Sequence, residues 1–353
     1  MKSENRLLSV VEHWLPRIEV AGIPSPTARA IIDRAGTWDR WLQTWAEEGD
    51  VHAELGERAL QAGRRITAGE AFARASLLYH FGQFMAFDDL SAKQEVAQKK
   101  VETFARAVPL LDPPGNITVI PYEGGMLKAI LRYPKPEGRH PLAVIIPGSD
   151  STKEEFPAFE KHLLSRGIAT LSLDGPGQGE GREFGPLQPD ISRAVRAAVD
   201  HLSSDERLNG ERGLVGMAFG GHLALRAAEV GGFTAVVSIN GFFDLGDFWP
   251  DLPQVYHDNM RFSLGGDNTF ERAKRFTLRE TPHLDIPALI LHGGRDKIFP
   301  PSEAERCMAI AGPESTLDIF PEGNHVCNNI SWKYRPLVAD WLSEQFKRSL
   351  RDN

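Results

Sequence analysis

From Pro114 onward the chain alternates short apolar runs with helical stretches, and this alternation restricts the fold more than any other feature. Six runs of strand length end at or next to glycine: "PLAVIIPG", "GIATLSLDG", "RGLVGMAFG", "FTAVVSING", "IPALILHGG" and "STLDIFPEG". Stretches such as "FPAFEKHLLSRG" and "DISRAVRAAVDHLSSD" separate several of them. Buried strands that alternate with helices predict a mainly parallel, doubly wound sheet. Active sites in such sheets form at the carboxyl ends of the strands.

The segment before Pro114 has a different pattern. Its apolar spacing predicts three helical stretches, over residues 27–49, 52–87 and 88–111, the last of which breaks at Pro109. Gly49 is interpreted as a helix stop signal, and "LLDPPGN" as the domain boundary. We therefore expect a helical N-terminal cap domain over residues 1–112 and an α/β domain over residues 113–353, with a helical insertion at about 241–285.

Composition excludes several classes of protein. The net charge of -8 over 353 residues argues against a nucleic-acid partner. Two cysteines are too few for a disulfide framework, and the N-terminus lacks the apolar core of a signal peptide. No apolar run is long enough to span a membrane. We therefore expect a cytoplasmic protein. We also expect no metal or other cofactor, because the histidines and acids show no ligand spacing.

One strand end carries a motif typical of serine hydrolases. "GMAFGG" matches G-x-S-x-G except that Ala218 occupies the position of the nucleophile serine. Gly216 and Gly220 suit a sharp strand-to-helix turn, where side chains would collide with the helix. The alternative is a glycine-rich turn of any α/β protein.

Two further strand ends carry an acid and a histidine. Asp296 follows a strand and a double glycine in "LILHGGRDKIFPP", and His325 follows the last predicted strand in "EGNH". The acid can fix the tautomer of an imidazole. Alone, they would be an ordinary turn aspartate and a surface histidine. Their chain order of nucleophile position, acid and histidine is that of α/β hydrolases.

The loop "PGSDSTKEEF" follows another strand and can direct backbone N–H groups at a developing oxyanion. We expect Phe219 and Ser149 to be the donors, with Gly148 as the alternate; the same loop also fits a helix N-cap. The later stretch "DGPGQGEG" fails the dinucleotide-binding spacing and is interpreted as a flexible loop at the rim of the site.

Aromatic residues predict an apolar pocket for a small aromatic or heteroaromatic carbonyl compound; the alternative is that more of them pack in the core. The predicted substrate-binding residues are Phe242, Phe243, Trp249, Tyr79, Phe84, Asp247, Tyr256 and His257. A carbon–carbon bond cleavage would also need an acid for the leaving carbanion. Asp244, Asp247, Tyr256 and His257 are the candidates.

The chain resembles a known family over nearly its whole length. The helical segment from "WDRWLQTWAEEGD" to "LLYHFGQF" and the motifs "PGSDSTKEEF", "DGPGQGEG", "GMAFGGHLA", "GGRDKIFP" and "EGNHVCNN" carry the resemblance. They are similar to α/β hydrolases that include 2,6-dihydroxypseudooxynicotine hydrolase and fungal polyketide-shortening hydrolases. The resemblance implies an α/β-hydrolase fold with a helical cap, a homodimer, and cleavage of a C–C, ester or amide bond.

The resemblance implies catalytic roles at positions 218, 296 and 325, and Ala218 alone departs from the pattern. Three interpretations stay open. The first is an engineered Ser-to-Ala substitution that inactivates the enzyme, which the otherwise complete set of residues favours. The second is a natural relative that binds a ligand without turnover. The third is an enzyme in which His325, held by Asp296, activates water or abstracts a substrate proton directly.

Overall fold

The computed structural model describes residues 3–135 and 137–352, which divide into two compact units. One unit contains Met1–Ile117 together with Glu154–Phe159, and the other contains Thr118–Lys153 and Glu160–Asn353. The division falls inside the first strand. No sequence pattern indicated that residues 154–159 belong with the helical unit.

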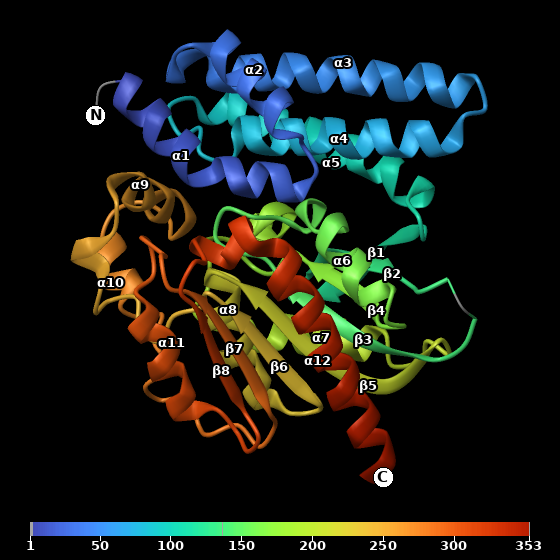
Figure 1. Ribbon diagram of the computed structural model, residues 1–353, viewed down its shortest axis with the longest axis vertical. Coiled ribbons are helices and arrows are strands. Elements are labelled where there is room, and N and C mark those ends of the chain that lie inside the picture. Colours follow the sequence, from blue (N-terminus) through green and yellow to red (C-terminus); the bar gives the residue numbers. More distant parts are fainter. Residues whose placement is uncertain (1–2, 136, 353) are drawn as a thin grey trace. The chain divides into compact units, whose positions relative to one another are not determined.

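The helical unit is built from five helices, coloured blue to cyan in Figure 1. They are α1 (Ser3–Ala21), α2 (Ser25–Ala35), α3 (Trp41–Gln61), α4 (Arg65–Gln83) and α5 (Leu90–Ala107), with short 3-10 turns at Trp38–Arg40 and Val108–Leu110. The carboxylate of Asp89 caps α5 by accepting from the N–H of Ala92 at 3.0 Å. α5 ends two residues before Pro109, near the break expected from the sequence.

Gly49 does not stop a helix, so that prediction was wrong. α3 continues through Gly49 to Gln61, and the predicted long helix over 52–87 is instead interrupted after Gln61. A Cβ atom at Gly49 would lie 2.5 Å from the Tyr79 ring, and one at Gly56 would lie 2.5 Å from the Phe72 ring. These glycines allow the aromatic rings of α4 to pack directly against the backbone of α3.

The segment 154–159 joins the helical unit through buried ion pairs. The Arg17 guanidinium contacts the Glu155 carboxylate at 2.6 Å, and the Lys100 ammonium contacts Glu154 at 3.0 Å. The Nε2 atom of His80 lies 3.3 Å from Glu155. Burial alone would raise the pKa of Glu155, but the charges and hydrogen bonds of Arg17 and His80 together outweigh it and hold this pKa well below its usual range. Glu155 is thus ionised inside the unit.

We expect Glu155→Gln to lower the free energy of unfolding by about 3 kcal/mol, because it removes the carboxylate charge that faces the largely buried Arg17 guanidinium. Urea unfolding at pH 7 measures the loss. Glu48→Gln removes the partner of Arg34 in a more exposed pair and should cost less than about 1 kcal/mol. Equal losses in the two variants would contradict the assignment.

The second unit contains an eight-stranded sheet (Figure 1). Its strands are β1 (Gly115–Tyr122), β2 (Gly125–Arg132), β3 (His140–Ile146), β4 (Ala169–Leu173), β5 (Leu208–Met217), β6 (Ala235–Ile239), β7 (Ala288–Gly293) and β8 (Thr316–Phe320), in the spatial order β1-β2-β4-β3-β5-β6-β7-β8. From β4 to β8 all neighbours pair in parallel, whereas β2 pairs with β4 in the antiparallel direction. The predicted mainly parallel sheet is confirmed.

Helices cover both faces of this sheet. The helices after β3 are α6 (Pro157–Leu164), α7 (Ser192–His201), α8 (Phe219–Ala227), α9 (Gln254–Ser263), α10 (Thr269–Ala273), α11 (Pro301–Cys307) and α12 (Ser331–Asp352), of which α9 and α10 lie in the segment between β6 and β7. A Cβ atom at Gly213 of β5 would meet Leu342 and Phe346 of α12, and one at Gly216 would meet the start of α8. Positions three apart in a strand point to opposite faces, so α12 and α8 cover opposite sides of β5.

Candidate active site

The turn between β5 and α8 holds its middle residue in an unusual backbone conformation. Ala218 lies between Met217, the last residue of β5, and Phe219, the first residue of α8, with φ 51° and ψ -117°. Such a conformation costs an L-residue roughly 1–3 kcal/mol. The Ala218 N–H donates to the Ile239 carbonyl of β6 at 2.8 Å, and its carbonyl accepts from Gly221 at 2.9 Å. The surrounding structure therefore enforces this strain.

Two glycines make the turn possible. A Cβ atom at Gly216 would lie 1.9 Å from the Gly220 carbonyl oxygen, and one at Gly220 would lie 2.1 Å from the carbonyl oxygen of Ile146 in β3. Both obstacles are backbone atoms that cannot rotate away. The glycine motif therefore brings the start of α8 against the end of β3.

Gly220→Ala should lower the free energy of unfolding by at least about 3 kcal/mol, because its methyl group collides with backbone of β3. Gly148→Ala is the matched control: its new methyl group meets no described atom closer than 3.3 Å, and we expect a loss of about 1 kcal/mol or less. Urea unfolding of both variants provides the comparison. A Gly220→Ala protein as stable as the control would show that the turn relaxes.

Backbone N–H groups surround position 218. A Cβ atom at Gly148 would lie 3.7 Å from the Ala218 Cβ atom and 4.0 Å from the Phe219 nitrogen, so the loop after β3 flanks the turn. The N–H groups of Phe219 and Ser149 have no hydrogen-bond acceptor within the described part of the chain.

Helix α9 contacts the same loop. The Asn259 side chain donates to the Ser149 hydroxyl at 2.9 Å, and the Ser263 hydroxyl donates to the Ser149 carbonyl at 3.3 Å. The ring of Tyr256, on the same helix, lies edge-on to His325 with centroids 6.2 Å apart. One face of α9 thus belongs to the site, which the sequence indicated for Tyr256 but not for Asn259 or Ser263.

The loop "DGPGQGEG" is buried and hydrogen-bonded, in contrast to the flexible rim loop expected from the sequence. The Gln178 amide donates to the Pro147 carbonyl at 2.5 Å and to the Gly148 carbonyl at 3.3 Å, and its oxygen accepts from the Gly175 N–H. Asp174 accepts from the backbone N–H and the ammonium group of Lys153. The loop therefore braces both ends of residues 147–153, a role that its composition did not reveal.

His325 and Asp296 form a hydrogen-bonded pair. The His325 Nδ1 atom lies 2.8 Å from Asp296 Oδ2, and the other carboxylate oxygen accepts from the N–H groups of Ile298 at 2.8 Å and Phe299 at 3.2 Å. The Asp296 side chain is fully buried, whereas that of His325 is 11% exposed. Because an ionised carboxylate only accepts, Nδ1 carries the proton and Nε2 is left as the base.

Burial would by itself raise the pKa of Asp296, but the charge and hydrogen bond of His325, the nearby His292 and the N–H of Ile298 outweigh it. The pKa of Asp296 is therefore lower than usual. A fourth donor was not foreseen: the Asn240 amide, at the end of β6, donates to Asp296 Oδ2 at 2.7 Å. Its only signal in the sequence is a polar residue directly after a buried strand.

Because the pKa of Asp296 is lowered on folding, its stabilising effect is present above the unfolded-state pKa of about 3.9 and is lost as pH falls through its lower folded-state value. Asp296→Asn places an amide N–H₂ group against buried hydrogen-bond donors. It should therefore lower the free energy of unfolding by about 2–4 kcal/mol at pH 7. The difference in free energy of unfolding between Asp296→Asn and the parent should become smaller below about pH 4. Urea unfolding at several pH values tests this, with the 95%-exposed Asp267→Asn as control. A pH-independent difference would contradict the prediction.

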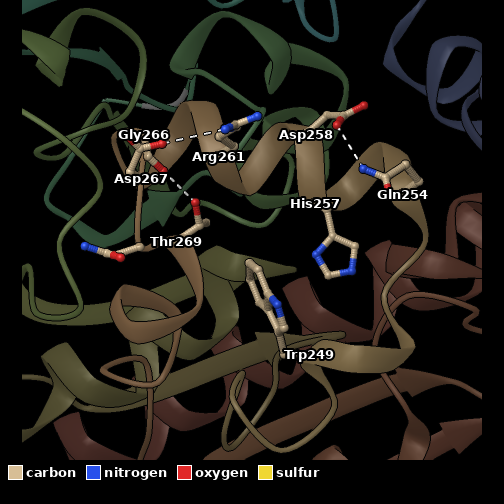
Figure 2. Close-up of a pocket in the computed structure, with 9 residues that line it drawn as sticks. Trp249, Gln254, His257, Asp258, Arg261, Gly266, Asp267 and Thr269 are labelled. Carbon is tan, nitrogen blue, oxygen red and sulfur yellow. Dashed lines mark hydrogen bonds and ion pairs between the residues drawn. The ribbon is translucent and has the colours of Figure 1, made fainter. Parts of the chain in front are cut away.

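The far side of α9 lines a pocket of about 250 Å³ within residues 249–269. Figure 2 shows Trp249 and His257 facing each other there, with ring centroids 4.8 Å apart. Gln254 donates to Asp258 across its rim at 3.1 Å. Among the residues predicted to bind substrate, Trp249 and His257 thus line this pocket, whereas Tyr256 on the other face of α9 lies beside His325.

Phe242 and Phe243 lie near the turn but are buried. The Phe242 ring stacks on His222 at 4.4 Å and packs against Phe219 at 5.0 Å. The Arg306 guanidinium covers the Phe243 ring at 4.6 Å. These contacts support the packing of α8 and α11.

Tyr79 and Phe84 lie in the core of the helical unit. The Tyr79 hydroxyl donates to Asp50 at 2.7 Å, and the Phe84 ring packs against Trp14 with centroids 5.4 Å apart. Each side chain is 2% exposed. Both residues therefore pack the helical unit.

The two candidate acids after β6 are held by arginines. Burial opposes the ionisation of Asp244, but hydrogen bonds from Thr277 and Arg279 hold its pKa below the usual range. Asp247 forms ion pairs with Arg279 and Arg306. Both carboxylates are engaged as acceptors, which does not suit the role of a proton donor near neutral pH.

No cluster of three or more potential metal ligands occurs among residues 3–135 and 137–352. Within the same ranges, no helix combines the length and the apolar character that crossing a bilayer demands.

Sequence comparison defines the family. The profile of the "Alpha/beta hydrolase family" matches residues 143–283. The chain is 31% identical over 324 residues to 2,6-dihydropseudooxynicotine hydrolase of Paenarthrobacter nicotinovorans, covering 88% of this chain and 87% of that protein. It is also 32% identical over 222 residues to the α/β hydrolase pydG of an Acremonium species, covering 59% of this chain and 52% of that protein. The chain belongs to the α/β hydrolase family.

Structural comparison agrees with this assignment. The crystal structure of 2,6-dihydroxy-pseudo-oxynicotine hydrolase matches with a TM-score of 0.82 at 30% identity, covering 87% of this chain and 88% of that one. AbyA5 matches with a TM-score of 0.69 at 19% identity, which shows similarity of fold. The predicted α/β-hydrolase fold and the family resemblance are confirmed.

Proposed function

We propose that the site is the acyl-transfer site of a carbonyl-compound hydrolase, in which position 218 is the nucleophile position and Ala218 stands in place of a serine. The observation that carries the proposal is the strained backbone of Ala218. A methyl group gains nothing from a conformation with φ 51° and ψ -117°, whereas a serine there would present its hydroxyl above the carboxyl ends of the strands.

With serine at position 218, His325 Nε2 would take the hydroxyl proton while the oxygen attacks the substrate carbonyl. Asp296 would stabilise the imidazolium. The N–H groups of Phe219 and Ser149 would hold the oxyanion, with Gly148 as the alternate donor. The tetrahedral intermediate would expel an alcohol, an amine or a stabilised carbanion, and water would then release the acyl group. For an ester or an amide, His325 would also give this proton to the leaving group.

We infer that the substrate is a small aromatic or heteroaromatic carbonyl compound with a scissile C–C, ester or amide bond. The support is the name of the bacterial relative, a hydrolase of 2,6-dihydropseudooxynicotine, together with Tyr256 beside His325. Trp249 and His257 are proposed to contact a larger substrate. A cytoplasmic homodimer remains our proposal for the assembly.

A second candidate function follows from Ala218 itself. With a methyl group at this position, the His325–Asp296 pair would act as a general base without a covalent intermediate, on water or on a proton next to the bound carbonyl. A natural relative that binds such a carbonyl compound without turnover would keep the same N–H groups. The following experiment separates these functions from acyl transfer.

Ala218→Ser should raise the hydrolysis of an activated aryl ester by roughly 10³-fold or more over the parent chain, because members of such a group act as a unit. The variant should also label covalently with a fluorophosphonate. Adding His325→Ala should suppress that labelling. Ala218→Gly, which suits the backbone but lacks a hydroxyl, is the matched control and should stay at the parent level.

A folded Ala218→Ser protein that neither turns over nor labels would refute acyl transfer. Parent activity that is lost in His325→Ala and unchanged in Ala218→Ser would favour the general-base function. Absence of turnover in every variant, combined with binding of the carbonyl compound, would favour the binding relative.

A further inference from the structure

Three non-glycine residues with left-handed backbones meet beside the His325–Asp296 pair. They are Asn240 with φ 49°, Val326 with φ 58° and Cys327 with φ 52°. This region suits asparagine but is a genuine outlier for a β-branched residue such as Val326. The turn that directly follows His325 is therefore strained, and something must hold it.

The Asn240 side chain contacts both the acid and this turn. Its amide nitrogen donates to Asp296 Oδ2 at 2.7 Å, and its oxygen accepts from the Cys327 thiol at 3.5 Å. The Asn240 backbone N–H donates to the Leu291 carbonyl of β7 at 2.7 Å. Asn240 is fully buried, so no bulk water competes for either end of the amide.

We propose that Asn240 is the positioning residue of the site: its amide fixes Asp296 on one side and the strained His325–Cys327 turn on the other. These contacts are present whatever the protein does, but a catalytic role for Asn240 rests on the proposed function. An amide can donate to a carboxylate through its nitrogen while it accepts from a thiol through its oxygen. An aspartate of the same shape would instead set a second carboxylate against Asp296.

The surrounding groups agree with this assignment. Burial raises the pKa of the Cys327 thiol to about 12, so it keeps its proton and can donate. His292 lies 3.7 Å from Asp296 Oδ2, but burial lowers its pKa and its Nε2 contacts the Phe299 carbonyl at 3.0 Å. Asn240 is thus the neutral donor that shares Oδ2 with His325.

Holding Oδ2 between two donors has a geometric consequence. The carboxylate cannot rotate away from His325 without breaking the Asn240 bond as well as the backbone bonds to its other oxygen. The Cys327 contact limits movement of the turn that carries the imidazole. Asn240 therefore fixes the distance between the two members of the pair.

The test uses the full Ala218 chain and the variants Asn240→Asp and Asn240→Gly, both of which tolerate a left-handed backbone. Ser238→Ala is the matched control, since Ser238 lies two residues earlier on β6, is buried, and its hydroxyl has no hydrogen-bond partner among the described residues. Proton NMR follows the downfield Nδ1–H signal of His325. Mass spectrometry follows alkylation of Cys327, with the buried Cys307 as internal reference.

In both Asn240 variants we expect the Nδ1–H signal to broaden or disappear and Cys327 to be alkylated about tenfold faster or more, with Cys307 unchanged. Ser238→Ala should behave as the parent. In an Ala218→Ser background, Asn240→Asp should lower kcat and leave KM nearly unchanged.

A parent-like signal and parent-like alkylation of Cys327 in both folded variants would overturn the proposal. Unfolding of both variants would also overturn it, because Asn240 would then act on stability rather than on the pair. Both measurements are independent of turnover, so an inactive Ala218→Ser protein would refute the proposed hydrolase and leave the Asn240 result to stand or fall by itself.

Discussion

The close approach of three backbone segments at the end of β5 is the constraint on which the site depends. Gly216, Ala218 and Gly220 let β5, β3 and the start of α8 meet at distances that exclude side chains. This contact brings Gly148 beside position 218. Asp296 and His325 lie at the same edge of the sheet as this turn, because neighbouring parallel strands end there.

Sequence reasoning succeeded where a function requires a particular residue type at a fixed place. Apolar runs of strand length predicted the parallel sheet, and glycines at 216 and 220 predicted the sharp turn. The contact between Asp296 and His325 could be expected from their positions after two neighbouring strands. These features are local, so a single sequence carries them.

The features that were missed depend on contacts between distant segments. Gly49 has the composition of a helix stop, and only the ring of Tyr79 shows why a glycine lies inside α3. Asn240 and Gln178 act through a carboxylate and a carbonyl that lie 56 and 31 residues away in sequence. No local pattern distinguishes such an amide from an ordinary turn residue. For the same reason, Tyr79 and Phe84 could not be separated from pocket aromatics.

The buried carboxylates of Glu154 and Glu155 have a consequence for how such a protein changes in evolution. Their cationic partners Lys100 and Arg17 lie in the helical unit, whereas the carboxylates themselves come from the loop after β3. A gene fusion that replaced residues 1–117 alone would strand two buried anions. The helical unit therefore consists of two separate pieces of chain, and an exchange of this unit between proteins would have to include the six residues 154–159 as well as residues 1–117.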